Sequence, residues 1–388
     1  ENSDELVANP IVAPSPASDV FEFVMRDLEY AAKYLPETSY ATGRVNQYSA
    51  FAMLSRVYLT YAGYSDNKNS GTRNSEYLEL AKKAALKVIE NKNFSLMDNY
   101  ADLFKIENNN NSETLFALQW VANSDTYGES NTIQNYFAYG SDVTGTDRAW
   151  GGATVAQPNA VWEYEQGDTR RKATWMAYGD FYPELMSDKG GLTVEYSESQ
   201  LNCKKYVCGS SKDNASISYG NTPINTYMIR LAEVYLNYAE ALNESTTDRN
   251  ITEMLNALNE VRVRGGLPKI KNDLGYEDMK KEIRRERAVE LYAEEHRFFD
   301  VRRWLIAGEE GIMKGEFYTF SLKEKAYNKY KVPQESWTAQ QKKDNDSWLY
   351  YAIEPFENRI WEDKMYLYPF PQDEVNKGII VQNPGWEL

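Results

Sequence analysis

The sequence predicts a mostly α-helical fold in which helix pairs build a scaffold that supports an irregular, loop-rich half with few short strands. Apolar residues recur at helical spacing in residues 19–90 and again in residues 223–308. Between residues 91 and 222 this periodicity fades, and glycine, asparagine, serine and aromatic residues become frequent. We expect one domain over residues 1–388, in which residues 309–388 form a second insertion and a closing segment.

Three helices are expected in the N-terminal part. After an extended lead-in rich in proline, alanine and serine, the first helix begins near Asp19 and ends at Pro36. Asp19 can cap this helix together with Glu22, three residues later. The second helix is expected over residues 46–62 and the third over residues 75–90, where small alanines allow neighbouring helices to approach closely.

An internal repeat links the two helical parts. LSRVYLTYA at residues 54–62 matches LAEVYLNYA at residues 231–239 at six positions. Each copy is followed by a loop and another amphipathic helix, over residues 75–90 and 251–264. Such helix pairs are similar to tetratricopeptide-type units, and the long spacing between the two copies indicates that the array is interrupted.

The interruption contains the long loops. A short strand is expected at ETLFALQW, residues 113–120, and a long loop over residues 123–152. Long loops inside compact domains usually serve a function, so we expect a ligand to bind here. Aromatic rings can stack on the C–H faces of sugars while polar neighbours bind hydroxyl groups, or two or three of the rings can instead seal the core below the loops. The candidate ligand-binding residues are Tyr136, Tyr139, Trp150, Trp175 and Tyr178.

The C-terminal part begins with an insertion over residues 309–351, which is rich in lysine, tyrosine and tryptophan. Residues 366–371 are expected to form an apolar, strand-like run. Trp386 is expected to dock into the helical core and so to fix the C-terminus.

Charge and the rarity of some residues exclude several classes of function. The formal net charge of −15 argues against a nucleic-acid partner, because binding of phosphates needs a basic surface. No run of about 18 apolar residues is present that would span a membrane. His296 is the only histidine, which excludes a zinc site of several histidines, and no glycine-rich loop indicates a nucleotide cofactor. We therefore expect no metal and no cofactor.

The only two cysteines, Cys203 and Cys208, leave two arrangements open. Their spacing is compatible with a small-loop disulfide and also with two free thiols. A metal site built on this pair is disfavoured because no further soft ligands accompany it.

A segment with the sequence ERAVELYAEEHRFFDVRRW, residues 286–304, combines charged and aromatic residues. At helical spacing Glu286, Glu290 and Glu294 line one stripe, and arginines are interleaved with them. Glycoside hydrolysis needs two carboxylates that face each other across a substrate. This pattern instead favours a buried helix whose carboxylates and guanidinium groups pair with one another, so we expect a structural and not a catalytic role.

The same segment resembles the signature of the SusD/RagB family of nutrient-binding lipoproteins. The matching pattern reads E-R-x-x-E-L-x-x-E-x-x-R-x-x-D-x-x-R-W. Other segments agree in the same order along the chain, namely DLEYAAKYLP (27–36), GRVNQYSAFAMLSRVYL (43–59), RLAEVYLNYAEALN (230–243), LNEVRVRGGL (258–267) and YLYPFPQDEVNKGIIVQNPGW (366–386). The resemblance therefore spans nearly the whole chain.

The resemblance implies a tetratricopeptide-like, superhelical scaffold and a glycan-binding lipoprotein on the cell surface, in the outer membrane of a Gram-negative bacterium. Such a protein captures oligosaccharide or polysaccharide for import through a SusC-like TonB-dependent transporter. Its only attachment to the membrane is an N-terminal lipid anchor, which we expect to precede the residues of this chain. A peptide-binding lid protein of the RagB type is the alternative interpretation, and a glycoside hydrolase is the third.

Overall fold

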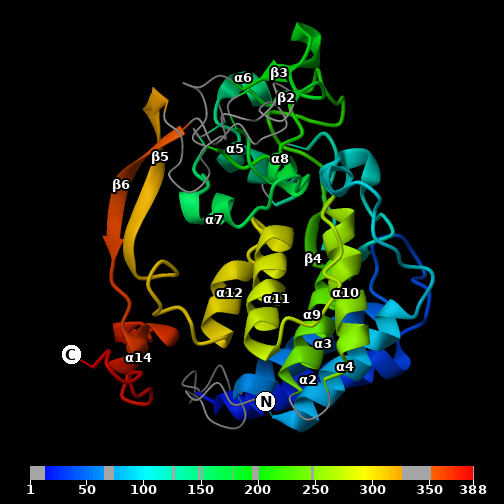
Figure 1. The fold of residues 1–388 in the computed structure, drawn as a ribbon, viewed down its shortest axis with the longest axis vertical. Helices are drawn as coiled ribbons and strands as arrows, with labels where there is room; N and C mark the ends of the chain where they lie inside the picture. Colours follow the sequence, from blue (N-terminus) through cyan, green and yellow to red (C-terminus); the bar gives the residue numbers. More distant parts are fainter. Residues whose placement is uncertain are drawn as a thin grey trace.

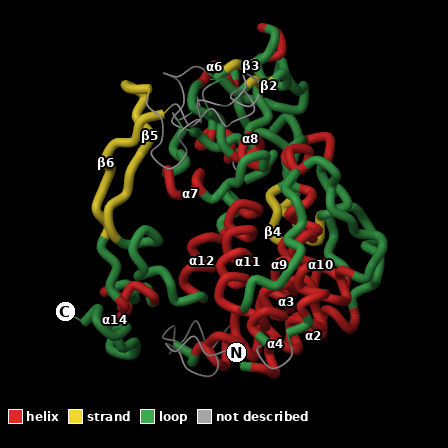
Figure 2. The backbone as a smooth tube through the Cα atoms, viewed as in Figure 1, coloured by secondary structure: helices red, strands yellow, loops and turns green. Residues whose placement is uncertain are grey.

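The computed structural model describes residues 14–64, 74–124, 126, 128–146, 149, 152–177, 179–194, 201–245, 249–325 and 351–387. The longer helices gather in one half of the molecule, and short helices, short strands and loops form the other half (Figure 1, Figure 2). The predicted mostly helical fold with a loop-rich half is therefore confirmed. None of the described helices combines the length and the hydrophobicity needed to cross a bilayer.

Helices of the scaffold pack side by side. They are α2 (Ala17–Tyr34), α3 (Gln47–Tyr64), α4 (Ser75–Ile89), α9 (Leu231–Glu244), α10 (Ile251–Arg264) and α11 (Tyr276–Leu291). The two copies of the repeat form the pairs α3–α4 and α9–α10, and α4 packs directly against α9 (Figure 1). The predicted helix pairs are confirmed, and the array that is interrupted in sequence is continuous in space.

Small residues and polar caps explain how these helices begin and pack. Ala52, Ala85 and Ala239 are completely buried in the core that the two pairs share, where small side chains let helix backbones approach. The side chain of Asn74 accepts hydrogen bonds from two backbone N–H groups in the first turn of α4. Asn250 accepts one at the start of α10, so each helix begins at a residue that satisfies its free N–H groups.

Short elements alternate with loops between α4 and α9. They are η1 (Tyr100–Phe104), η2 (Ile106–Asn108), β1 (Thr114–Leu118), α5 (Ile133–Phe137), α6 (Ser141–Thr144), α7 (Pro158–Trp162), α8 (Arg170–Thr174), β2 (Phe181–Tyr182), η3 (Ser187–Lys189), β3 (Leu192–Thr193) and β4 (Thr226–Arg230). Strand β1 pairs antiparallel with β4, and β2 with β3. The strand predicted at residues 113–120 is present as β1. Because β4 runs directly into α9, the β1–β4 sheet ties the loops to the scaffold.

The helix predicted over residues 286–304 is broken in two. Helix α11 ends at Leu291, and α12 (His296–Arg303) begins after a turn in which Ala293 and Glu295 have φ values of 61° and 64°. The prediction of one continuous helix was therefore wrong. Neither residue is a glycine, so the sequence carries no ordinary signal for these left-handed conformations.

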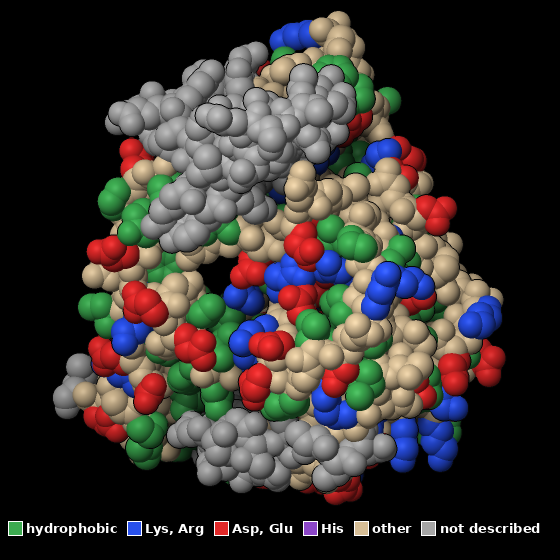
Figure 3. All heavy atoms as spheres, viewed as in Figure 1, with side chains coloured by type: hydrophobic (Ala, Val, Ile, Leu, Met, Phe, Trp, Pro, Cys, Tyr) green, Lys and Arg blue, Asp and Glu red, His purple; other side chains and the backbone are tan. Residues whose placement is uncertain are grey.

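A β-hairpin stands beside both halves of the molecule. Strand β5 (Gly315–Lys325) lies in the region predicted to be an insertion, residues 309–351, and pairs antiparallel with β6 (Tyr351–Arg359), which extends beyond it. Phe320 on β5 is fully buried in a cluster that includes Val161 of α7 and Val289 of α11. Away from this contact, Figure 3 shows an opening between the hairpin and the helical body.

The closing segment differs from its prediction in two respects. It contains η5 (Asp363–Tyr366) and α14 (Gln372–Val375), and no strand forms at residues 366–371. The indole N–H of Trp386 donates to the backbone oxygens of Lys364 and Leu367, each at 3.0 Å. Trp386 therefore closes the C-terminal segment on itself and does not dock into the helical core.

Cys203 and Cys208 are free thiols, which decides between the two arrangements left open by the sequence. Cys203 is buried, and Cys208 is half-buried. Desolvation raises the pKa of both thiols to about 12, so both stay protonated and unreactive at neutral pH.

Candidate functional site

A buried network of ion pairs joins the loop-rich half to the scaffold. Arg170, at the start of α8, is fully buried and contacts the carboxylate of Asp168 at 2.8 Å. Its Nη1 atom lies 2.5 Å from an oxygen of Glu286 and 3.0 Å from one of Glu290, both on α11. Burial lowers the pKa of Arg170, but these carboxylates outweigh burial and raise the pKa well above its usual value. The α8 segment is thus held to α11 by charge.

Arg230, the last residue of β4, and Lys205 extend the network, and Arg264 of α10 also contacts Glu290. Arg230 lies 2.6 Å from Glu290 and 2.8 Å from Glu294, and Lys205 lies 2.8 Å from Glu294. Burial raises the pKa of the Glu294 carboxyl, but Arg230 and Lys205 outweigh it and bring that pKa down to about 2. The predicted pairing of this carboxylate stripe with cationic residues is confirmed. We call the cluster the junction; its members are Arg170, Lys205, Arg230, Glu286, Glu290 and Glu294.

Above the junction, Tyr139 lies beside the chain that follows Trp150. A Cβ atom added to Gly152 would lie 3.3 Å from the Cα of Tyr139 and 1.8 Å from Nδ2 of Asn202. Gly152 also has a φ of 64°, which favours glycine. Glycine at this position therefore lets the segments that contain Tyr139, Gly152 and Asn202 pack closely together. Trp150 itself lies outside the described residues.

Asn202 connects the segments that meet there. Its side chain donates a hydrogen bond to the backbone oxygen of Gly152 at 3.3 Å, and its own backbone oxygen accepts one from Met176 at 2.8 Å. A β-bridge pairs Asn202 with Val155, and the next residue pairs with Trp175. Asn202 could not be predicted from the sequence, because its role depends on pairing between distant loop segments.

Tyr136 projects from α5, close to Tyr139 along the chain. Its side chain is 46% exposed. The neighbouring Gln134 is buried and donates to the backbone oxygens of Gly209 and Gly220, at 3.0 and 2.7 Å, so α5 is fixed to the loop beneath it. We call Tyr136 and Tyr139, together with Gly152 and Asn202, which meet beside Tyr139, the aromatic ledge.

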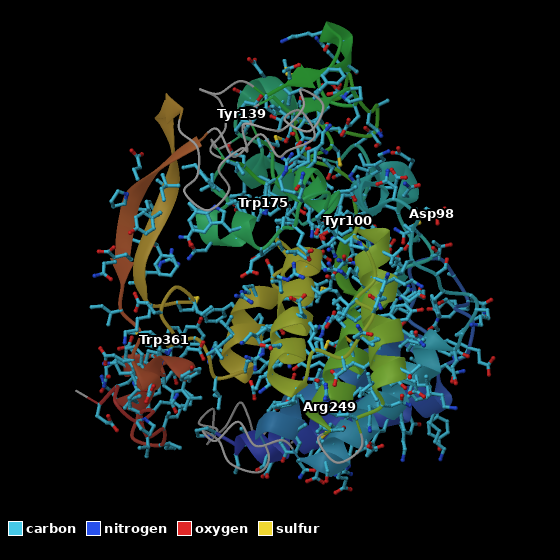
Figure 4. All side chains as sticks on the ribbon, viewed as in Figure 1. Asp98, Tyr100, Tyr139, Trp175, Arg249 and Trp361 are labelled. Atoms are coloured by element: carbon cyan, nitrogen blue, oxygen red, sulfur yellow. The ribbon has the colours of Figure 1, made fainter. Side chains whose placement is uncertain are left out.

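Trp175 lies deeper than the ledge. Figure 4 shows it below Tyr139, between the loops and α11. Its side chain is 5% exposed, and the centroid of its ring lies 6.1 Å from that of Tyr292. This position favours the core-sealing role over direct contact with a ligand. Tyr178, three residues further on, lies outside the described residues.

Two hollows flank the turn at residues 208–214 in the same half. The first has a volume of about 380 Å³ and is lined by residues that include Lys105, Glu107, Lys172, Phe181 and Asn214. The second has a volume of about 350 Å³ and is lined by residues that include Asp142, Thr146, Asp188 and Lys212. Both volumes fall in the range of small-molecule sites, and their polar groups suit ligands that carry many hydroxyl groups.

Phe181 is a surface aromatic residue that the sequence analysis missed. Its ring is 45% exposed at the first hollow. The available signal was its place in GDFYPE, where an aromatic pair is flanked by turn-forming glycine, aspartate and proline. Within the described ranges, no group of three or more His, Cys, Asp or Glu side chains is arranged to hold a metal ion.

The fold and the site define a class of protein in which stacked helix pairs present a loop-built, aromatic surface. The sequence model of the SusD family matches residues 59–386, and the chain belongs to this family. It is 37% identical over 307 residues to a SusD-like protein from Bacteroides ovatus, an alignment that covers 78% of this chain and 54% of that protein. The chain spans a little over half the length of the curated relatives that it matches.

Solved structures agree with this assignment. One, determined with xylogluco-oligosaccharide, is 31% identical with a TM-score of 0.76, and the match covers 97% of this chain and 74% of that chain. A SusD-like protein from Bacteroides fragilis is 24% identical with a TM-score of 0.74, and the match covers 97% and 73% of the two chains. The second likeness concerns the fold alone.

Proposed function

We propose that this protein is a cell-surface glycan-binding protein that captures oligosaccharide or polysaccharide for import through a SusC-like TonB-dependent transporter. The proposal rests on the aromatic ledge, in a fold that a 31% identical protein uses in a structure with xylogluco-oligosaccharide. The ring of Tyr136 is accessible for stacking on the C–H face of a sugar. The hollows of the same half supply charged and amide groups for its hydroxyls.

In this mechanism the protein binds a glycan and does not convert it. Tyr136, Tyr139, Trp150 and Tyr178 stack on successive sugar rings, while the junction keeps the loops that present them in place. An N-terminal lipid anchor holds the protein at the outer membrane, where it acts as a lid over the transporter. Weak contacts of this kind gain strength when many repeat units of a polysaccharide bind at once.

The carboxylate stripe gives no support to a hydrolase. Glu286, Glu290 and Glu294 are only 2%, 0% and 8% exposed. Their oxygens contact arginine and lysine side chains of the junction. A hydrolase needs two carboxylates that reach a substrate from opposite sides, and these three do not face a cleft.

Calorimetric titration with xyloglucan-derived and other neutral oligosaccharides tests the proposal. We expect Tyr136→Ala and Trp150→Ala to weaken binding at least about tenfold, which corresponds to about 1.4 kcal/mol. Tyr30→Ala is the matched control, because Tyr30 is 67% exposed on α2 in the scaffold. Binding of extended peptides and of no sugar would replace the proposal with the peptide-binding alternative.

A further inference from the structure

A third hollow lies where the scaffold meets the loop-rich half, between the loop after α2, the segment after α4 and strand β1. It has a volume of about 540 Å³, larger than either hollow that flanks the turn at residues 208–214. We call it the amide groove because of the carboxamide side chains that line it, which are Asn46, Asn91, Asn93, Asn110, Asn111 and Gln119. In Figure 1 its segments are the blue and cyan loops at the right edge, away from α5 and α6.

The chemistry of the groove suits a neutral, hydroxyl-rich ligand. Carboxamides can donate and accept hydrogen bonds at the same time, as sugar hydroxyls do. The charged residues that line the groove are Glu37 and Arg44, both exposed. Phe94 and Phe116 supply an apolar portion of the lining. A few directed polar groups around apolar walls are typical of ligand sites.

An exposed aromatic residue lies in the chain between Ser39 and Ala41, two residues that line the groove. Tyr40 lies in the loop that forms one wall, and its side chain is 78% exposed. The guanidinium carbon of Arg44 lies 5.8 Å from the centroid of this ring. The ring therefore has a defined neighbour and keeps an accessible surface on which a sugar can stack.

The wall that carries Tyr40 is held in one conformation. Ser39 donates a hydrogen bond to the backbone oxygen of Arg44 at 2.7 Å, and Asn46 donates to the hydroxyl of Ser39 at 3.2 Å. Gly43 has a φ of 81°, and a Cβ atom there would lie 2.7 Å from Cδ of Gln119. The loop is thus closed tightly against the opposite wall, and a ligand would not have to order it.

Part of the hydrogen-bonding capacity of the groove is unused. The hydroxyl oxygen of Thr114, a residue of its lining, is buried and has no partner in the described part of the chain. Buried hydroxyl groups are nearly always hydrogen-bonded in folded proteins, so this hydroxyl is a candidate hydrogen-bond partner for a ligand of the groove.

We propose that the amide groove is a second binding site for neutral oligosaccharide, separate from the aromatic ledge. This inference rests on the proposed glycan-binding function, because it assumes the same class of ligand. Two sites on one molecule would let the protein hold two stretches of a long polysaccharide, so that release of one stretch leaves the other bound.

Titration of the full chain with the oligosaccharide that binds the ledge tests the inference. We expect two sites per molecule. The variants Tyr40→Ala and Asn93→Ala should reduce this to one site or weaken the second site at least fivefold. Both residues are exposed, so the fold should persist. Lys92→Ala is the matched control, because Lys92 is the exposed neighbour of Asn93 and does not line the groove.

Hydrogen exchange distinguishes ligand binding at the amide groove from ligand binding at the aromatic ledge. With the Trp150→Ala variant at saturating oligosaccharide, we expect protection at residues 37–46 and 110–119. One site per molecule, lost in Trp150→Ala and unchanged in Asn93→Ala, would overturn the second site and leave the proposed function intact. No binding of any sugar, with or without these substitutions, would overturn both. Protection of the groove by peptides alone would assign it to a different ligand class and overturn the inference.

Discussion

Each cation of the junction depends on carboxylates from another part of the chain. Lys205 is fully buried, and burial lowers its pKa while Glu294 opposes that change. Arg230 is likewise surrounded by carboxylates, which raise its pKa despite burial. Removing one partner would leave a buried charge without compensation, which is far more costly than the loss of an exposed ion pair.

Substitution of Glu294 should destabilise the folded protein. We expect Glu294→Gln to lower the free energy of unfolding at pH 7 by roughly 3–5 kcal/mol, because Lys205 and Arg230 remain buried. The pKa of Glu294 is about 2 in the folded protein against an ordinary 4.5, so the carboxylate stabilises the fold above about pH 4.5. This contribution is lost as the pH falls toward 2. The difference between variant and wild type should therefore shrink across that interval.

Urea titrations at a series of pH values measure this difference. Glu374→Gln is the control, because Glu374 forms an ion pair with Lys377 on the surface and is 46% exposed at its side chain. We expect that control to change stability by less than about 1 kcal/mol. Equal effects of the two substitutions would contradict the role assigned to the junction.

Part of the junction could be predicted from the sequence. Glu286, Glu290 and Glu294 could be assigned to ion pairs because arginines are interleaved with them. Their actual partners could not be assigned, since Arg170 lies 120 residues from Glu290 and Lys205 lies 89 residues from Glu294. Helical spacing reports only neighbours on one helix, and these contacts come from the packing of distant segments.

At the scale of secondary-structure elements, the hairpin shows why some strands cannot be predicted from the sequence. Phe317 and Phe320 on β5 are 3% and 0% exposed, so two residues three apart face the protein. The pairing of β5 with β6 shifts register between Phe317 and Tyr318. Such an irregularity reverses the alternation of side chains, and the period of two that identifies a strand is lost from the sequence. Long helices with an unbroken period were predicted much better.

Phe320→Ala should loosen the hairpin. Phe320 is fully buried against α7 and α11, and removal of a buried phenylalanine ring typically costs roughly 3–5 kcal/mol. We expect faster hydrogen exchange at residues 315–320 and 353–359, with the scaffold helices unchanged. Phe356→Ala on the partner strand is the control, because Phe356 is 60% exposed. Uniformly faster exchange throughout the molecule would show that the hairpin is part of one folding unit with the scaffold.

At the scale of the whole molecule, charge restricts the choice of ligand. The net charge of −15 creates a field that repels polyanions and does not act on neutral molecules. Acidic and basic side chains are interspersed over the face shown in Figure 3. Under the proposed function, the overall field would select weakly among neutral sugars, and their discrimination would depend on local contacts in the binding site.

The effect of charge on ligand choice can be measured from the salt dependence of the dissociation constant. We expect the dissociation constant of a neutral oligosaccharide to change less than about twofold between roughly 0.05 and 0.5 M NaCl, because no net charge is neutralised on binding. A polyuronate of similar length should bind more weakly at low salt than at high salt. Strong weakening of neutral-sugar binding by salt would contradict a contact surface made of rings and hydroxyl-binding groups.

The junction also bears on how such proteins diversify. Arg170 of α8, Lys205 and Arg230 of β4 connect three separate segments to the backbone around Glu290 and Glu294 through ion pairs. Between these fastening points the chain adds buried residues such as Trp175 and Leu201 to the cluster shared with α11, so substitutions are tolerated best at its exposed positions. A designer who keeps the three cations and the buried residues could replace the exposed loop positions with those of another family member. The product would be a binding protein with a new specificity on the same scaffold.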